Sequence, residues 1–165
     1  MFRLRDDVKE HFKRIYRDGG EDATTPFTRQ MDFYYVCLLL GIASGRKSTP
    51  EAAATTDLVR NWIGEYKGCR GLIIGLLLIA EMAEFGIDHA DREDVLKLIE
   101  DMIDADSEAK LSQKGYQLAN AYASGGYEYL REKSPGQPYH SSAFLPRYVK
   151  ILRDAVDANS TWSGT

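Results

Sequence analysis

The chain has 165 residues, of which 44% are hydrophobic, and a formal net charge of −4 at pH 7. This length suits a single domain with a sizeable core, and the mildly acidic balance excludes a global positive field that would attract nucleic acid or anionic lipid. The first residues show no signal-peptide pattern, and Cys37 and Cys69 lie in apolar surroundings, so we expect a cytoplasmic protein with reduced thiols.

Residues 2–18 are predicted to form an amphipathic surface helix. Leu4, Val8, Phe12 and Ile15 recur at helical spacing, with charged residues on the opposite face. The basic members of that face are Arg3, Arg5, Lys9, Lys13, Arg14 and Arg17, and acidic residues dilute them. Such alternation is typical of a solvated helix face, while the sharper interpretation is a patch that contacts phosphate groups.

The spacing of Arg5 and His11 resembles the Arg-x(4–6)-His pattern of helical ribonucleases of the HEPN type. The resemblance rests on these two residues only, and positions six apart on one helix point about 240° away from each other. A small helical nuclease that uses Arg5 and His11 is one alternative function.

Two apolar segments, residues 31–43 and 69–87, are predicted to be helices that pack on each other. Residues 71–80 carry no charge and place apolar side chains on every helical face, so the second helix should be enclosed by others. It is shorter than the roughly 20 apolar residues of a membrane span. Because glycine costs about 1 kcal/mol in a helix interior, Gly41 and Gly75 predict close contact between helix backbones.

A glycine-rich turn at residues 41–50 ends the first of these helices. Gly45 fits a helix C-cap, and Arg46 and Lys47 then complement the helix dipole. The turn does not match a P-loop, which follows a strand and opens a helix. Arg46 and Lys47 are the best local candidates for contact with an anion or a partner.

The middle of the chain is also predicted to be helical. Thr49 is expected to cap a short helix, and Asp57 a longer one that buries Trp62. Asp91 is expected to cap a helix that runs to about Ile103. The buried stripe predicted for this last helix is Leu96, Ile99 and Ile103.

A further helix is predicted from residue 108 to about 124, where the double glycine at 125–126 breaks or kinks it. The last helix is expected to have Ser141 or Ser142 as its N-cap. The sequence thus predicts an all-α fold, a compact single-domain bundle of about six to seven helices around a buried central helix at residues 69–86. The domain covers residues 1–158, and residues 159–165 form a disordered C-terminal tail.

Between Asp88 and Glu108 nine acidic residues stand against two basic ones, and the role of this acidic face stays open. Asp104, Glu108 and Lys110 could mimic the Asp…Glu-x-Lys set of a divalent-metal nuclease, but that set is normally held on adjacent strands, and the sequence shows no strand pattern here. The cysteines and histidines have no zinc-binding spacing. No metal or cofactor is expected.

Two short blocks carry a family resemblance, FYYVCLLLGIASGRK at residues 33–47 and NAYASGG at residues 120–126. They resemble small accessory proteins encoded with bacterial DNA phosphorothioation and related phage-defence systems, in which an apolar helix ends in Gly-x-x-x-Gly-Arg/Lys and a late helix ends in Tyr-Ala-x-Gly-Gly. The resemblance implies a component that assembles with a larger ATPase or nuclease. It identifies no catalytic residue.

We therefore expect a non-catalytic helical accessory subunit of a DNA-modification-linked or phage-defence assembly. Its partner would be a larger protein subunit, its contact with DNA indirect, and it would have no membrane contact. The candidate contact residues are Arg3, Arg5, Lys9, Lys13, Arg14, Arg46 and Lys47. The alternatives are a small helical nuclease, which uses Arg5 and His11 or Glu108 and Lys110, and a direct DNA-binding protein.

Overall fold

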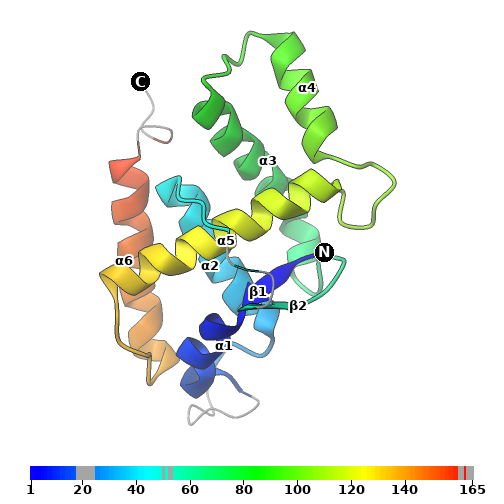
Figure 1. Cartoon of the computed structure of the whole chain (residues 1–165). Helices are drawn as coiled ribbons and strands as arrows, with labels where there is room; N and C mark the ends of the chain where they lie inside the picture. The colour runs from blue at the N-terminus through cyan, green and yellow to red at the C-terminus, as the bar shows by residue number, and fades with distance from the viewer. Residues whose placement is uncertain (18–24, 50, 52–53, 160–161, 163–165) are drawn as a thin grey trace.

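The computed structural model describes residues 1–17, 25–49, 51, 54–159 and 162, and within them the chain forms six α-helices and one short antiparallel sheet (Figure 1). In chain order the elements are β1 (Arg3–Arg5), α1 (Asp6–Phe12), the 3-10 helix η1 (Lys13–Ile15), α2 (Gln30–Ser44), β2 (Thr55–Asp57), α3 (Tyr66–Phe85), α4 (Arg92–Met102), α5 (Gln113–Lys133) and α6 (Ser141–Ala158). The prediction of a compact, mostly helical domain is confirmed. The small sheet is an addition that the predicted all-α fold lacks.

The centre of the fold is the crossing of α2 and α5 (Figure 1). A Cβ atom on Gly126 of α5 would lie 1.9 Å from the carbonyl oxygen of Cys37, and one on Gly41 of α2 would lie 1.9 Å from the carbonyl oxygen of Tyr122. Only glycine lets two helix backbones approach so closely. The backbone contact predicted at Gly41 is confirmed, and α5 supplies the other backbone.

The predicted break at residues 125–126 is wrong, because α5 runs without interruption from Gln113 to Lys133. A Cβ on Gly125 would lie 2.2 Å from the carbonyl oxygen of Arg46, in the turn after α2. Both glycines of the pair are therefore required for close packing, while their φ and ψ angles stay helical. A glycine pair that ends a helix and one that lets a neighbour approach look alike in the sequence.

α2 is the enclosed helix of the fold. Tyr34, Cys37 and Leu38 have no exposed surface, and the ring of Phe33 stacks on Phe12 of α1 with the centroids 4.7 Å apart. Burial raises the pKa of the Cys37 thiol, so this thiol stays protonated. The cysteine is a core residue, as its apolar neighbours in the sequence predict.

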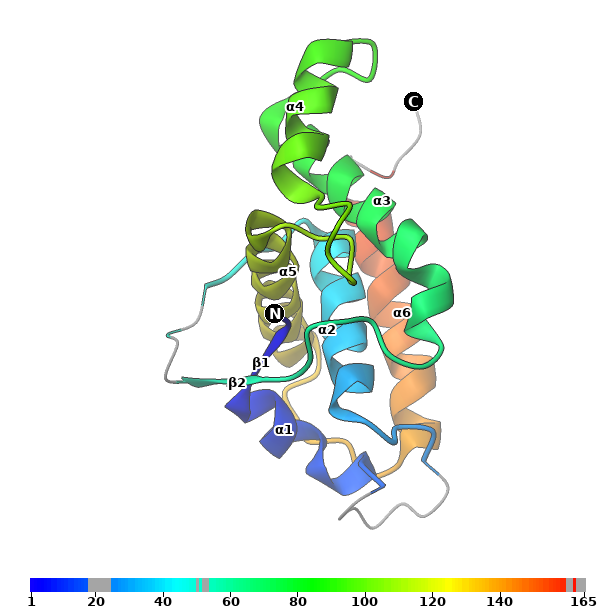
Figure 2. The ribbon, with the colours of Figure 1, turned by 90° about the vertical axis from the view of Figure 1, so that its right-hand side faces the viewer.

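The prediction of a buried central helix at residues 69–86 is wrong. α3 buries one face through Ile73 and Leu77, but Leu72 is 65% exposed, Phe85 63% and Ile79 37%. The physical reason is that the glycines of α2 and α5 let those two backbones meet, so that α5 and not α3 packs most closely on α2. α3 lies outside them, with its opposite face uncovered (Figure 2).

Residues 3–5 and 55–57 form the strands β1 and β2 where helices were predicted, while residues 6–12 of the predicted N-terminal helix form α1. Leu4 of β1 pairs with Thr56 of β2, and the alternation of buried Phe2, exposed Arg3 and buried Leu4 has the period of a strand. The helix predicted to start at Asp57 is therefore absent. The predicted burial of Trp62 is confirmed, and its indole N–H donates to the carbonyl oxygen of Ala109 at 3.0 Å.

α4 begins where the sequence predicts, because the Asp91 side chain accepts a hydrogen bond from the backbone N–H of Asp94. Its predicted buried stripe is shifted: Leu98 and Met102 are buried, whereas Leu96 is 56% exposed. The α3–α4 hairpin projects from the rest of the molecule (Figure 2). None of the described helices combines the length and hydropathy that a membrane span requires.

Parts of three predictions fall outside the described residues. These are most of the loop at 19–26, most of the short helix predicted after Thr49, and residues 160–161 and 163–165 of the predicted tail.

Candidate functional site

Each of the seven basic candidate residues has an acidic or aromatic partner within this chain. On the N-terminal segment, Arg3 pairs with Asp57 at 2.8 Å, Arg5 with Asp7 and Glu128 at 2.8 Å, Lys9 with Asp6 at 3.7 Å, and Lys13 with Glu10. In the turn after α2, Arg46 pairs with Glu132 at 2.6 Å and Lys47 with Glu81 at 2.9 Å. The guanidinium of Arg14 lies 4.0 Å from the centre of the Tyr139 ring. A nearby carboxylate cancels most of the positive potential that a phosphate group would meet. The structure therefore places these residues in contacts within the chain and not on one continuous basic surface.

Arg5 and Arg46 meet at Glu128 of α5. The guanidinium of Arg5 donates to both carboxylate oxygens of Asp7 and to Glu128, which also accepts a hydrogen bond from the Ser48 hydroxyl at 2.6 Å. A cavity of about 350 Å³ opens beside this cluster, and its walls carry three arginines and three acidic residues. The cluster ties α1 and the turn after α2 to α5, and its charges balance.

The structure does not assemble Arg5 and His11 into one reactive site. The His11 ring lies edge-on to Tyr127, with centroids 5.6 Å apart, and His11 is only 5% exposed. Burial, followed by the positive charge of Arg131, lowers the pKa of His11 to about 4. His11 does not line the cavity that Arg5 borders, so a substrate there would not reach its imidazole.

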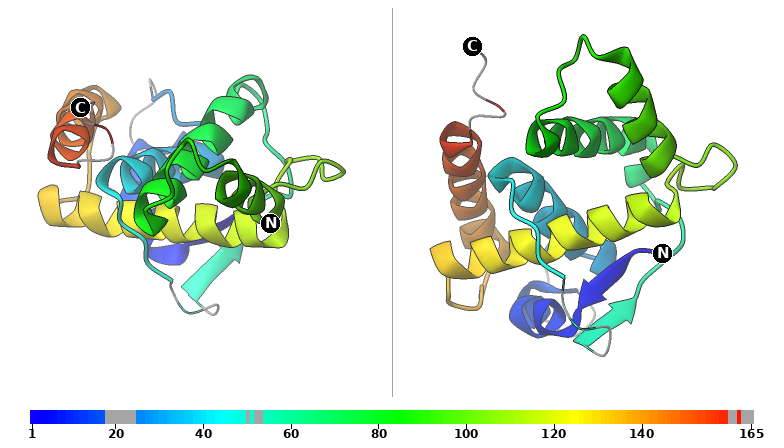
Figure 3. Two further views of the ribbon diagram at one scale, coloured as in Figure 1. Left: turned by 90° about the horizontal axis from the view of Figure 1, so that it is seen from above. Right: turned by 45° about the horizontal axis from the view of Figure 1, so that its top comes forward.

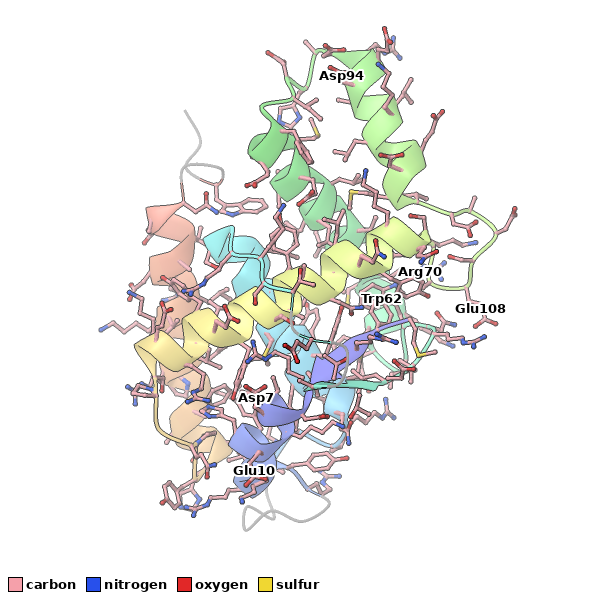
Figure 4. The ribbon with its side chains drawn as sticks, in the orientation of Figure 1. Asp7, Glu10, Trp62, Arg70, Asp94 and Glu108 are labelled. Atoms are coloured by element: carbon pink, nitrogen blue, oxygen red, sulfur yellow. The ribbon has the colours of Figure 1, made fainter. Side chains whose placement is uncertain are left out.

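Glu108 and Lys110 also do not form a reactive site together. Glu108 accepts a hydrogen bond from the Asn61 amide at 3.2 Å, and Lys110 donates to the carbonyl oxygen of Ala105. Glu108 lies on the loop after α4, far from Asp7 and Glu10 on α1 (Figure 4). In the described part of the chain, no three His, Cys, Asp or Glu residues come together as metal ligands would.

A second cavity of about 400 Å³ lies between β1, the segment after α2 and α5. Its hydroxyl groups come from Ser48, Thr49, Thr55 and Ser124, and Arg3 is the one charged residue of its described lining. A serine nucleophile needs an adjacent base, and these lining residues supply neither a histidine nor a carboxylate. The described walls of the cavity therefore lack the groups of a hydrolase.

A buried polar network joins α3 to the core, and the sequence did not reveal it. Glu81 is 1% exposed and accepts hydrogen bonds from the ammonium of Lys47 at 2.9 Å and from the Tyr122 hydroxyl at 2.8 Å. Burial, and then the bond to Glu81, raises the pKa of Tyr122, which stays a donor. Glu81 lies near the charged end of α3, where Glu84 is exposed. The structure makes it the anchor of that end.

The outer face of α3 is an exposed apolar surface with an unusual glycine content. Gly68, Gly71 and Gly75 have no described atom within 4 Å of the position that a Cβ would take, so the backbone contact predicted at Gly75 is wrong within this chain. Leu72 and Ile79 lie on the same helical face and are 65% and 37% exposed. Glycine has no packing role there in the free chain.

An apolar groove lies between α2, α3 and α6, where the end of α2 separates the other two helices (Figure 3). Its lining residues are Leu39, Ile42, Ala43, Leu76, Leu152, Val156 and Trp162. Asn159 and Trp162 belong to the predicted disordered tail. Here the Asn159 amide donates to the carbonyl oxygen of Ala43 at 3.0 Å, and the Trp162 side chain is half-buried.

The described residues thus define a helical protein with paired surface charges and uncovered apolar faces on α3 and α6. No family model matches the chain, and comparisons with curated proteins and with solved structures gave no significant match.

Proposed function

We propose that this chain is a non-catalytic helical subunit that docks onto a larger protein through the outer face of α3. The observation that carries the proposal is the contrast between its glycines. A Cβ atom on Gly41, Gly125 or Gly126 would lie closer than 3 Å to a neighbouring backbone, whereas one on Gly68, Gly71 or Gly75 would meet no described atom.

Glycines in a helix carry an energetic cost that a close contact can offset. Each costs about 1 kcal/mol relative to alanine, and the three on α3 gain no packing in the free chain. Small residues beside exposed Leu72 and Ile79 form the kind of surface on which a second helix can pack closely. Contiguous exposed apolar patches on soluble proteins commonly mark such interfaces.

The resemblance of residues 33–47 and 120–126 to accessory proteins of phosphorothioation-linked and phage-defence systems supplies the proposed partner, a larger ATPase or nuclease. Contact with DNA would then be made by the partner. The pairing of all seven basic candidates with residues of the same chain supports an indirect role. Because these basic residues are already paired, we propose the outer face of α3 as the docking surface in their place.

The test is affinity purification of the tagged full chain from its native host. Wild type should recover one large protein, which mass spectrometry identifies as an ATPase or nuclease. Leu72→Glu should abolish its recovery, because a carboxylate would be buried without a partner in the interface. Lys150→Glu, a change at an exposed position of α6, should recover it like wild type.

Thermal unfolding of the purified variants separates lost docking from lost folding. Since Leu72 is 65% exposed, its replacement should change stability by no more than about 0.5 kcal/mol. Recovery of the chain only as a free monomer, or equal recovery with Leu72→Glu, would overturn the proposal.

A further inference from the structure

The cavity between β1, the segment after α2 and α5 has the size of a small-molecule site. It encloses about 400 Å³, and such sites commonly enclose roughly 300–1,000 Å³. One wall is a single face of α5, on which Gln117, Ala121 and Ser124 recur at helical spacing. β1 and β2 contribute Arg3 and Thr55. No residue of α3 belongs to the described lining, so the cavity is distinct from the proposed docking surface.

The walls of this cavity are fixed to one another by hydrogen bonds. The side-chain oxygen of Asn120 accepts the backbone N–H of Arg3 at 2.9 Å, and the Asn120 amide donates to the carbonyl oxygen of Met1 at 3.1 Å. The backbone N–H of Ser48 donates to the carbonyl oxygen of Ala121 at 3.0 Å. These bonds hold β1 and the segment after α2 against α5. The site is therefore formed before a ligand enters, which lowers the cost of binding.

Two polar side chains on the α5 wall have no hydrogen-bond partner in the described part of the chain. Ser124 is only 6% exposed, so its hydroxyl is shielded from bulk water, while Gln117 lies at the exposed end of the cavity. A buried polar group without a partner is unfavourable, and a ligand can supply the missing bond. Seven residues of an α-helix span about 10 Å. A ligand that bonds both side chains therefore has polar groups at both ends.

The charges around the cavity favour an uncharged ligand. Arg3 is the one charged residue of the described lining, and its Nε donates to Asp57 at 2.8 Å. A phosphate group would meet a positive charge that this carboxylate largely cancels, and a cation would meet no carboxylate among the described lining residues. The planar guanidinium can still stack on a flat ring.

We propose that this cavity binds a neutral nucleoside. The base stacks on the guanidinium of Arg3 and bonds the Ser124 hydroxyl at the buried end, and the sugar hydroxyls bond the Gln117 amide at the exposed end. A hydroxyl and an amide each donate and accept, so both can pair with the mixed donors and acceptors of a base and a sugar. A free sugar has no flat ring for Arg3 and is too short to bond both side chains.

The test is isothermal titration calorimetry of the full chain with adenosine, guanosine, cytidine and uridine, one at a time. At least one should bind saturably at one site per chain. Its 5′-monophosphate should bind no more tightly, and ribose should not bind. Absence of binding by all four nucleosides, ribose that binds as tightly, or a monophosphate that binds more tightly would each overturn the inference.

Variants of the full chain test the contacts. Ser124→Ala should weaken binding about tenfold, as expected for the loss of one buried hydrogen bond. Because its hydroxyl has no described partner, the melting temperature should stay at the wild-type value, which separates lost binding from lost folding. Gln117→Ala should weaken binding less, because water replaces the bond at the exposed end.

Gln113→Ala is the matched control, since Gln113 is exposed on the same helix and outside the described lining. It should bind the nucleoside like wild type. Leu72→Glu should also bind like wild type, so this outcome is independent of the purification test. Unchanged affinity in Ser124→Ala, or a loss in Gln113→Ala as large as that in Gln117→Ala, would contradict the proposed site.

Discussion

α2 and α3 are the two most apolar helices of the chain, yet one lies at its centre and the other on its surface. The difference lies in their glycines. Gly41 of α2 meets Gly126 of α5, where an added Cβ would lie only 2.4 Å from the Gly41 nitrogen, while Gly75 of α3 meets nothing within 4 Å among the described residues. An apolar run shows that a helix avoids water, and the glycine contacts show which neighbour covers it.

The largest expected effect comes from filling the α2–α5 crossing. Gly126→Ala would force a Cβ to within 1.9 Å of the Cys37 carbonyl oxygen, and neither helix can yield without losing the core. Overpacking of this severity should cost about 3 kcal/mol or more. Urea unfolding of wild type and variant measures it, and a loss below about 1 kcal/mol would mean that the helices do not cross here.

The buried anchor of α3 should give the next largest effect. Glu81→Ala leaves the Tyr122 hydroxyl and the Lys47 ammonium without their buried acceptor. Because Lys47 is partly exposed and has Glu84 at 3.8 Å, the expected loss is about 2 kcal/mol. Glu84→Ala is the matched control and should cost less than about 1 kcal/mol. Equal losses in the two variants would contradict the anchor.

His11 should make the stability of the core depend on pH. Its pKa is lowered to about 4 in the folded chain, against 6.5 for an exposed histidine. Below pH 6.5 the unfolded chain binds a proton that the folded chain does not, so stability falls as the pH drops from about 6.5 to 4. Unfolding free energies of wild type and His11→Gln across this range check it: the fall in this window should be smaller in the variant.

The smallest effect, and the one of opposite sign, belongs to α3. Gly75→Ala adds a methyl group that meets no described atom and should stabilise the free chain by up to about 1 kcal/mol through helix propensity. The same substitution thus has opposite signs at Gly126 and Gly75. A loss of stability in Gly75→Ala would show that the outer face of α3 is packed within the chain.

Much of the helical organisation could be predicted from the sequence, because it depends on local signals. Asp91 as an N-cap, Gly45 as a C-cap and the buried Trp62 are examples. The β1–β2 pair could have been suspected from the alternation of Phe2, Arg3 and Leu4, which helical spacing of the following residues concealed.

What the sequence could not provide was the choice of neighbours. The same double glycine fits a broken helix or a close crossing, and only the position of Cys37 decides between them. Lys47 likewise fits an anion site until Glu81 is found 2.9 Å away. The groove depends on Trp162, in a segment whose composition predicts a disordered tail. Contacts between residues far apart in the chain, which carry the candidate sites, leave little local signal.

The most direct test of the central claim, that the outer face of α3 is kept free for another protein, is partner recovery with Gly75→Leu. A Cβ atom at this position meets no described atom within 4 Å and leucine favours a helix over glycine, so the variant should be at least as stable as wild type, yet it should lose the large partner in affinity purification from the native host. A stable Gly75→Leu chain that still recovers the partner at the wild-type level would contradict the claim.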